Sequence, residues 1–188
     1  MEGLAGHRGS LLGNTGQPQP SQKAFESELA AALCGFDPDR LVLVEAESNK
    51  IGARIIPPSL WDAMKPAGRI RLDVPIDVRA RYLVRAYDDV LSDGARLKSL
   101  LNHLRAYRGH AIVDHWFQQI DSDDKLGLTR SLMEQHYDPS YDASRRSVNA
   151  PVVAVLGSDN LDPSGIDELA ERIENHVAQL SESVTLPA

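Results

Sequence analysis

The sequence contains almost no cysteine, few aromatic residues and no long apolar run. Its 188 residues include one cysteine, Cys34, which excludes an internal disulfide and a cysteine-based zinc site and fits a reducing compartment. No stretch approaches the ~18 apolar residues of a membrane span, and residues 1–20 lack the apolar run of a signal peptide. We therefore expect a soluble, cytoplasmic protein with no membrane partner.

Positive charge is also scarce. Lysine and arginine together number 20 against 27 aspartates and glutamates, which gives a net charge of -7. Bulk charge thus gives no sign of a nucleic-acid-binding protein, and contact with RNA would depend on a local basic patch or a partner domain. The length, with 42% hydrophobic and 25% charged residues, is typical of one globular domain.

Short apolar runs alternate with helical patterns along the chain. The run at 41–45 is apolar on both faces up to Glu45, which is typical of a buried parallel strand, and residues 70–74 and 151–156 are two further strand candidates. Strands separated by helices predict an α/β fold, here a parallel sheet of about three strands with a large helical portion. Three strands are few for so many helices, which suggests that part of the sheet is missing.

We expect one domain over residues 1–188. Residues 1–20 carry five glycines and two prolines and predict an irregular loop. Residues 21–35 and 76–91 each predict a helix, and 145–188 predict the last strand and a C-terminal helix. For that last helix, Ser164 and Asp167 have the spacing of a capping box.

Four segments place dense polar residues beside glycines or strand ends. They are His7–Gly13 (HRGSLLG), Gln17–Glu26 (QPQPSQKAFE), Val44–Gly52 (VEAESNKIG) and Leu132–Tyr141 (LMEQHYDPSY). In this order and spacing they closely resemble the C-terminal half of tRNA 2-selenouridine synthases, from residue 2 to about residue 144. One such segment would be a weak signal, but four in register are a strong one.

The resemblance implies a P-loop NTPase-like domain, which in that family follows a rhodanese-like domain with a chalcogen-handling cysteine. Family members replace the sulfur of 2-thiouridine at the tRNA wobble position with selenium. The selenium comes from selenophosphate, and a geranylated intermediate forms from geranyl diphosphate. The resemblance therefore implies tRNA as partner and these two compounds as family substrates, and we assign no bound cofactor to this chain.

The sequence departs from the family pattern in two ways. It contains no G-x-x-x-x-G-K-[ST], so the phosphate-cradling Walker A loop is absent. A rhodanese domain is absent too, since Cys34 falls in a helix tail. We expect a P-loop-like domain truncated before the Walker A motif and inactive alone, whose other half a separately encoded chain could supply. Two alternatives stay open: a relative of P-loop-type small-molecule phosphotransferases, and a non-catalytic tRNA-docking module.

Glu45 and Glu47 are the candidate catalytic residues. They follow a predicted buried strand, and open α/β sheets bind ligands at such strand ends. A carboxylate there can hold Mg²⁺ through water or orient a nucleophile, as the Walker B acid does. The alternative is an exposed strand end whose acids cap the next turn.

A larger set of residues is predicted to bind substrate or phosphate. It consists of His7, Arg8, Ser10, Gln22, Lys23, Ser48, Lys50, Arg79 and Arg81. Glycines beside the basic pair suit an anion-binding loop, and an arginine fork suits phosphate. The alternatives are a flexible terminus, a surface pair between Lys23 and Glu26, and a solvated helix face that carries the arginines.

His136, Tyr137 and Tyr141 are the candidate tRNA-binding residues. Such a polar and aromatic turn can stack on a base or position a ribose, although tyrosines also commonly bridge core and surface. We predict no metal site, because the best candidates, three histidines, lack the i, i+4 spacing of a helical zinc site. These are His103, His110 and His115.

Overall fold

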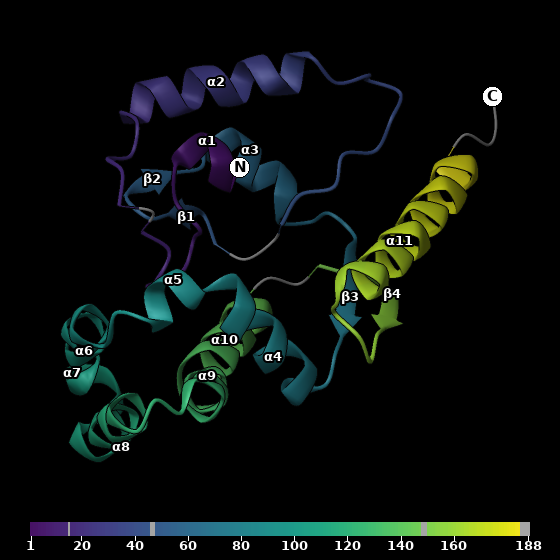
Figure 1. The fold of residues 1–188 in the computed structure, drawn as a ribbon. Helices are drawn as coiled ribbons and strands as arrows, with labels where there is room; N and C mark the ends of the chain where they lie inside the picture. The colour runs from purple at the N-terminus through teal and green to yellow at the C-terminus, as the bar shows by residue number, and fades with distance from the viewer. Residues whose placement is uncertain (15, 46–47, 148–149, 185–188) are drawn as a thin grey trace. The chain divides into compact units, whose positions relative to one another are not determined.

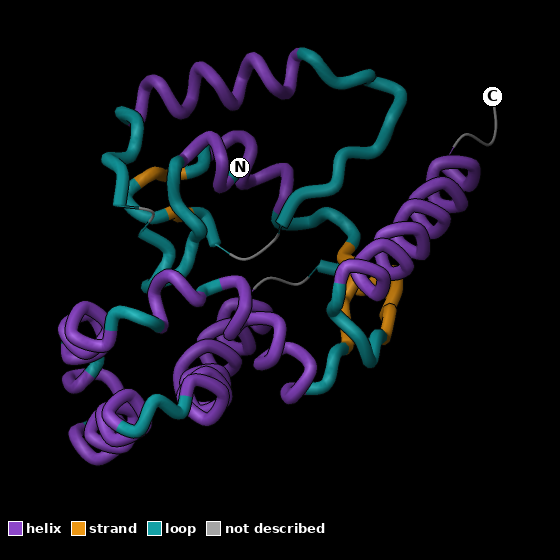
Figure 2. Tube along the Cα trace, in the orientation of Figure 1, coloured by secondary structure: helices purple, strands orange, loops and turns teal. Residues whose placement is uncertain are grey.

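Over the residues that the structure describes, the chain is mostly helical, with two separate two-stranded sheets (Figure 1). A computed structural model describes residues 1–14, 16–45, 48–147 and 150–184. Helices dominate the second half of the chain, whereas coil and turns make up much of the first (Figure 2). The chain divides into two units. The first comprises Met1–Arg71, Ser147–Ala154 and Glu171–Ala188, and the second comprises Leu72–Arg146 and Val155–Ala170.

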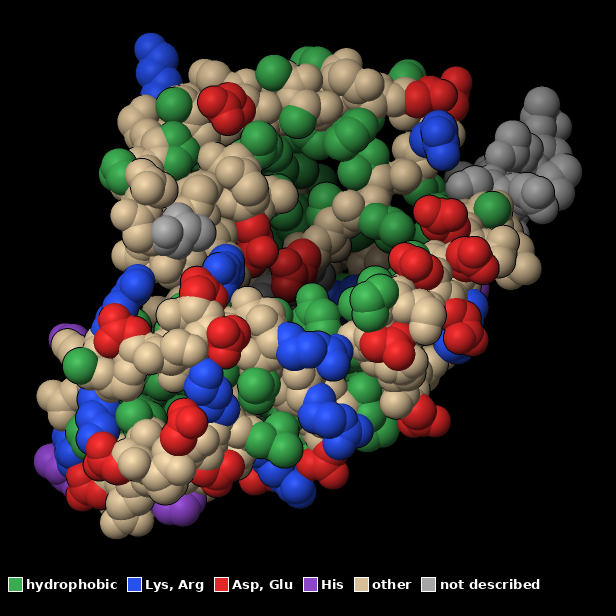
Figure 3. Space-filling view, viewed as in Figure 1, with side chains coloured by type: hydrophobic (Ala, Val, Ile, Leu, Met, Phe, Trp, Pro, Cys, Tyr) green, Lys and Arg blue, Asp and Glu red, His purple; other side chains and the backbone are tan. Residues whose placement is uncertain are grey.

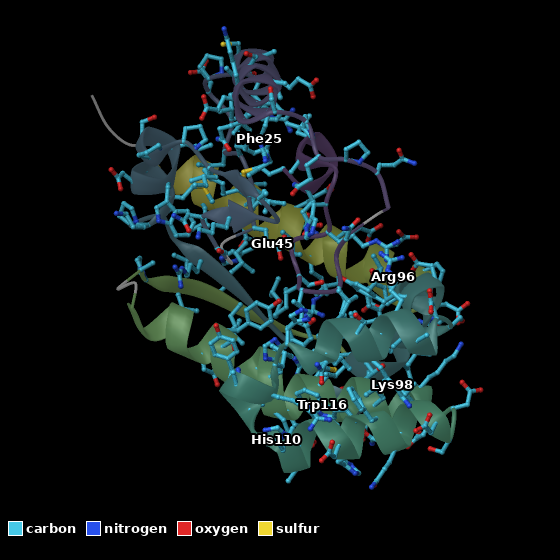
Figure 4. All side chains as sticks on the ribbon, turned by 90° about the vertical axis from the view of Figure 1, so that its left-hand side faces the viewer. Phe25, Glu45, Arg96, Lys98, His110 and Trp116 are labelled. Carbon is cyan, nitrogen blue, oxygen red and sulfur yellow. The ribbon has the colours of Figure 1, made fainter. Side chains whose placement is uncertain are left out.

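Three helices and a β-hairpin form the core of the first unit. These elements are α1 (Glu2–Ala5), α2 (Gln22–Cys34), β1 (Lys50–Ile51), β2 (Arg54–Ile55) and α3 (Pro58–Met64). Their buried side chains form one cluster of Ala5, Phe25, Leu29, Ile51, Ile56 and Met64. Phe25 lies on the side of α2 that faces α1 and α3 (Figure 4). Helix α2 begins and ends as predicted, because the Ser21 hydroxyl caps it by accepting from Ala24 N–H at 3.1 Å and Gly35 follows its last residue.

The predicted strand at 41–45 is not a strand. These residues form coil, and the side chains of Leu41, Val42, Leu43 and Val44 are between 42 and 56% exposed. Figure 3 shows hydrophobic side chains gathered between α2 and the coil that follows it. An apolar run becomes a strand only where a neighbouring strand satisfies its backbone N–H and C=O groups. No strand among the described residues pairs with this run, and the prediction was therefore wrong.

Short helices make up most of the second unit. They are α4 (Ile76–Ala86), α5 (Asp88–Leu91), α6 (Gly94–Asn102), α7 (Arg105–Arg108), α8 (His110–Asp121), α9 (Lys125–Leu132), η1 (Met133–Tyr137) and α10 (Asp138–Ser147). The single helix predicted over 76–91 is interrupted at Tyr87, whose φ of -118° and ψ of 22° are not helical. Trp116 of α8 is fully buried among these helices (Figure 4), and its indole N–H donates to the Gln135 side-chain oxygen at 3.0 Å.

Strands β3 (Arg69–Asp73) and β4 (Val152–Gly157) pair in the second sheet. Arg69 N–H donates to Pro151 C=O at one end and Ser158 N–H to Asp73 C=O at the other, so the two strands run parallel. This confirms the mixed α/β class and the parallel pairing of these two strands. The sheet has two strands rather than about three, because the run at 41–45 does not join it.

Helix α11 (Pro163–Val184) follows β4. The predicted capping box at Ser164 was wrong by two residues, because the Asp162 carboxylate accepts from Gly165 N–H at 2.9 Å and from the Ser164 hydroxyl at 2.8 Å. Hydrogen bonds from Asn160, Gly165 and Ser164 lower the pKa of Asp162 to about 2. Among the described residues, no helix is long and apolar enough to cross a membrane.

Candidate functional site

Two pockets in the first unit share the β1–β2 hairpin. The smaller, here the Glu45 pocket, has a volume of about 140 Å³ and is lined by Met1, Glu2, Gly9, Leu43, Val44, Glu45, Ser48, Lys50, Ile51 and Ile56. The larger, here the Arg54 pocket, has a volume of about 450 Å³ and is lined by His7, Asn14, Gln17, Pro18, Gln19, Gly52, Ala53 and Arg54.

The Glu45 pocket combines charged groups of both signs over an apolar floor. Glu2 and Glu45 bring carboxylates and Lys50 brings an ammonium, while Ile51 and Ile56 are buried beneath them. The Ser48 hydroxyl accepts from Lys50 N–H at 3.1 Å, which fixes the turn that leads into β1. Such a set can hold an anionic group on the ammonium while a carboxylate accepts a proton or orients a hydroxyl.

The loop at 7–14 brings its residues to both pockets. His7 and Asn14 form a β-bridge, and Arg8 N–H donates to Gly13 C=O at 2.9 Å. Gly9 has a φ of +78°, a left-handed conformation that favours glycine, and a Cβ built on it would lie 2.6 Å from a carboxylate oxygen of Glu2. The loop thus places Gly9 in the Glu45 pocket and His7 in the Arg54 pocket.

Two glutamines attach the hairpin to the rest of the unit. The Gln19 amide donates to the carbonyls of Ala5 and Ile51, at 2.8 and 3.0 Å, and accepts from Ala53 N–H at 2.7 Å. The Gln22 amide donates to Ile55 C=O at 2.7 Å and accepts from Ile55 N–H at 3.0 Å. The contacts with the hairpin join residues 32 to 34 apart in sequence, and those of Gln19 were not foreseen. The only sequence signal for it was the density of glutamine and proline in residues 17–22.

The predicted residues of the first unit separate into those in pockets and those outside them. Glu45, Ser48 and Lys50 line the Glu45 pocket, and His7 lines the Arg54 pocket. The others line neither. Arg8 and Ser10 are half-buried in the 7–14 loop, Gln22 is bonded to β2, Lys23 is exposed on α2, and Glu47 lies outside the described residues. The residues that sequence reasoning missed are Glu2, whose only signal was its charge, and Arg54, which follows the turn glycine Gly52.

Arg79 and Arg81 lie on α4 in the second unit and line neither of the two pockets. The Arg79 guanidinium donates to both Asp138 carboxylate oxygens at 2.9 Å, and this hydrogen bonding raises the pKa of Arg79. Its fork is therefore occupied by a carboxylate. Arg81 is exposed.

The predicted tRNA-binding residues form one cluster in the second unit. The rings of His136 and Tyr137 meet edge to face with centroids 4.8 Å apart, and Tyr137 stacks with Tyr141 at 6.3 Å. Arg108 donates to His136 Nδ1 at 3.1 Å, to His136 C=O at 3.0 Å and to the Ser140 hydroxyl at 2.9 Å. Burial, followed by the Arg108 charge, lowers the pKa of His136 and keeps the ring neutral.

This cluster is built on a π-helix. Residues Met133–Tyr137 form η1, between α9 and α10. Short π-helical segments are rare and occur often at functional sites. No group of three or more His, Cys, Asp or Glu side chains within the described residues could hold a metal ion.

Comparisons with family models and with curated proteins point to the same family. A family model described as the tRNA 2-selenouridine synthase AAA domain matches residues 1–102, more than half of the chain. The chain belongs to the tRNA 2-selenouridine synthase family. The match covers both pockets of the first unit.

Individual relatives extend beyond that matched region. A tRNA 2-selenouridine synthase of Shewanella frigidimarina is 42% identical over 169 residues, covering 75% of this chain and 46% of the relative. Another, of Cupriavidus pinatubonensis, is 38% identical over 172 residues, covering 87% of this chain and 46% of the relative. The chain thus spans less than half the length of these curated relatives. No solved structure matches the chain.

Proposed function

We propose that this chain takes part in replacing sulfur by selenium in 2-thiouridine at the wobble position of tRNA, through a geranylated intermediate. Its contribution is the binding of tRNA and of a diphosphate or selenophosphate group. The observation that supports this best is the convergence of Glu45, Ser48 and Lys50 on one pocket inside the region that the family model matches.

The charges of the Glu45 pocket suggest a role for each group. The Lys50 ammonium binds the anionic end of the substrate, since it is a compact cation with three donors. The Glu45 carboxylate accepts or returns a proton at the reacting group, and Glu47 assists as a second acid. The His136–Tyr137–Tyr141 cluster contributes an aromatic surface for an unstacked base of the tRNA.

The test is a glutamine substitution in a full-length relative that carries glutamate at the position of Glu45. Selenouridine formation from geranylated tRNA and selenophosphate should fall about 100-fold or more, as is usual when a general acid or base is removed. The melting temperature should stay nearly unchanged, because Glu45 is exposed. Glutamine at the position of Glu28, exposed on α2 and outside both pockets, is the control. A large loss of stability with full activity per folded molecule would make Glu45 structural.

A further inference from the structure

The Arg54 pocket has a different chemistry from the Glu45 pocket. Its lining includes Arg54, His7 and three side-chain amides, but no aspartate or glutamate. In a chain whose net charge is -7, a cavity that holds a cation and no carboxylate favours an anion. Its volume of about 450 Å³ falls within the range of ~300–1,000 Å³ typical of ligand pockets.

Within the part of the chain that the structure describes, the Arg54 guanidinium has an unpaired donor. Its Nε is buried and makes no hydrogen bond, and no carboxylate within the described part of the chain pairs with this side chain. A buried donor without an acceptor costs free energy, and a charged donor more so. Arg79 also has an unpaired Nε, but Asp138 neutralises its guanidinium. Within the described residues, no such carboxylate neutralises Arg54, which lines the pocket.

The walls of the pocket are fixed by close contacts. Gly52 has a φ of +60°, and a Cβ on it would lie 2.8 Å from His7 Cγ and would also overlap the Gln19 side-chain oxygen. Gly9 N–H donates to His7 Nδ1 at 3.1 Å, so the proton of the neutral imidazole lies on Nε2, where it can be donated. Since three backbone groups already occupy the Gln19 amide, Gln19 supports the wall and does not serve as a ligand group.

We propose that the Arg54 pocket is a phosphate-binding site, in which the Arg54 guanidinium and the His7 Nε2–H donate to phosphate oxygens. The guanidinium fork matches phosphate geometry, and a carboxylate-free wall does not compete for it. The identity of the natural ligand, a small diphosphate or the tRNA backbone, is inferred from the proposed function. The inference that the pocket binds phosphate does not depend on that function.

Calorimetric titration of the purified chain with inorganic phosphate, pyrophosphate and an anticodon stem-loop RNA tests this site. Arg54→Gln should weaken binding of at least one probe about tenfold or more, since a charge-assisted hydrogen bond is lost. Arg40→Gln is the matched control, because Arg40 is an exposed arginine of the same unit outside both pockets, and it should change affinity less than twofold. Arg54→Lys keeps the charge but loses the fork, and should give an intermediate affinity.

The outcomes distinguish a small phosphate compound from the tRNA backbone, and they also test whether the pocket binds phosphate at all. Arg54-dependent binding of pyrophosphate or phosphate assigns the pocket to a small molecule, whereas dependence with RNA alone assigns it to the tRNA backbone. Equal losses in Arg54→Gln and Arg40→Gln, or no Arg54-dependent binding of any probe by a folded chain, overturn the proposal. Because no selenium chemistry is measured, failure here leaves the proposed function untouched, and failure of the Glu45 test leaves this site untouched.

Discussion

The Gln19 and Gln22 side chains bond to the hairpin as a neighbouring strand would. Each primary amide presents a donor and an acceptor in the same arrangement as a peptide group, so one side chain can satisfy an exposed edge of β1 or β2. The hairpin has only two residues in each strand and depends on these bonds for its position. Both pockets depend on it in turn, because each takes lining residues from it.

Substitution of Gln22 by leucine should therefore loosen the hairpin. Two hydrogen bonds to Ile55 disappear, and a loss of about 1–2 kcal/mol in local stability is expected. Hydrogen exchange at the Ile55 amide measures this directly, since that N–H donates to Gln22. Lys23→Leu, at the next position on the exposed face of α2, should leave the exchange rate unchanged. Equal exchange in the two variants would contradict a role for Gln22 in holding the hairpin.

The lowered pKa of His136 predicts how the stability of the folded chain changes with pH. The folded chain holds this ring neutral, while the unfolded chain protonates it at its ordinary pKa of 6.5. The unfolded state thus binds more protons below pH 6.5, and stability falls as the pH drops from there towards the folded pKa. His136→Asn keeps an acceptor for Arg108 and cannot titrate, so urea midpoints measured from pH 7.5 to 5 should decline less than in the wild type. Parallel declines would show that His136 contributes nothing to the pH dependence.

At the scale of elements, the sequence predicted the ends of helix α2, because the residues that start and stop a helix act locally. Helix α2 begins after Ser21 and ends before Gly35, as predicted, because a cap acts within one turn. The π-helix was not predictable, since nothing local separates Met133–Tyr137 from an α-helix. The strand predicted at 41–45 does not form for a different reason. An apolar run indicates burial, but it becomes a strand only where another strand, distant in sequence, pairs with it. The Arg54 pocket likewise depends on contacts between residues 7, 19 and 52, which no spacing rule connects.

The exposure of residues 41–44 predicts that a charged substitution in this run is tolerated. Val42→Lys should leave the free energy of unfolding in urea unchanged to within about 0.5 kcal/mol and should raise the solubility of the chain. Ile56→Lys, a buried position of the same unit, is the contrasting control and should unfold that unit. If Val42→Lys destabilises the chain as severely as the control does, this segment is buried in solution.

At the scale of the whole molecule, the proposed binding sites lie in a sequence without a Walker A motif. The one cysteine of the chain lies exposed next to Gly35 at the end of α2. The chain also spans less than half of its curated relatives. Binding and turnover should therefore separate in this protein.

The purified 188-residue chain, given selenophosphate and geranylated tRNA, should form no selenouridine. A full-length relative, assayed in parallel by mass spectrometry of digested tRNA, is the positive control. The same chain should still bind tRNA, which a gel-shift measurement checks. Selenium incorporation by the chain alone would refute this prediction and would show that the reacting groups lie among the residues described here.

The π-helix has a consequence for how this region can vary. A π-turn holds one more residue than an α-turn at nearly the same total rotation, so removing one residue from 133–136 would restore ordinary helix and leave the residues after it in nearly the same register. Asp138 would then stay within reach of Arg79. Helix α9 has no such turn, so a residue removed from it would rotate everything after it by about 100°. We therefore expect single-codon deletions to be tolerated within 133–136 and not within α9.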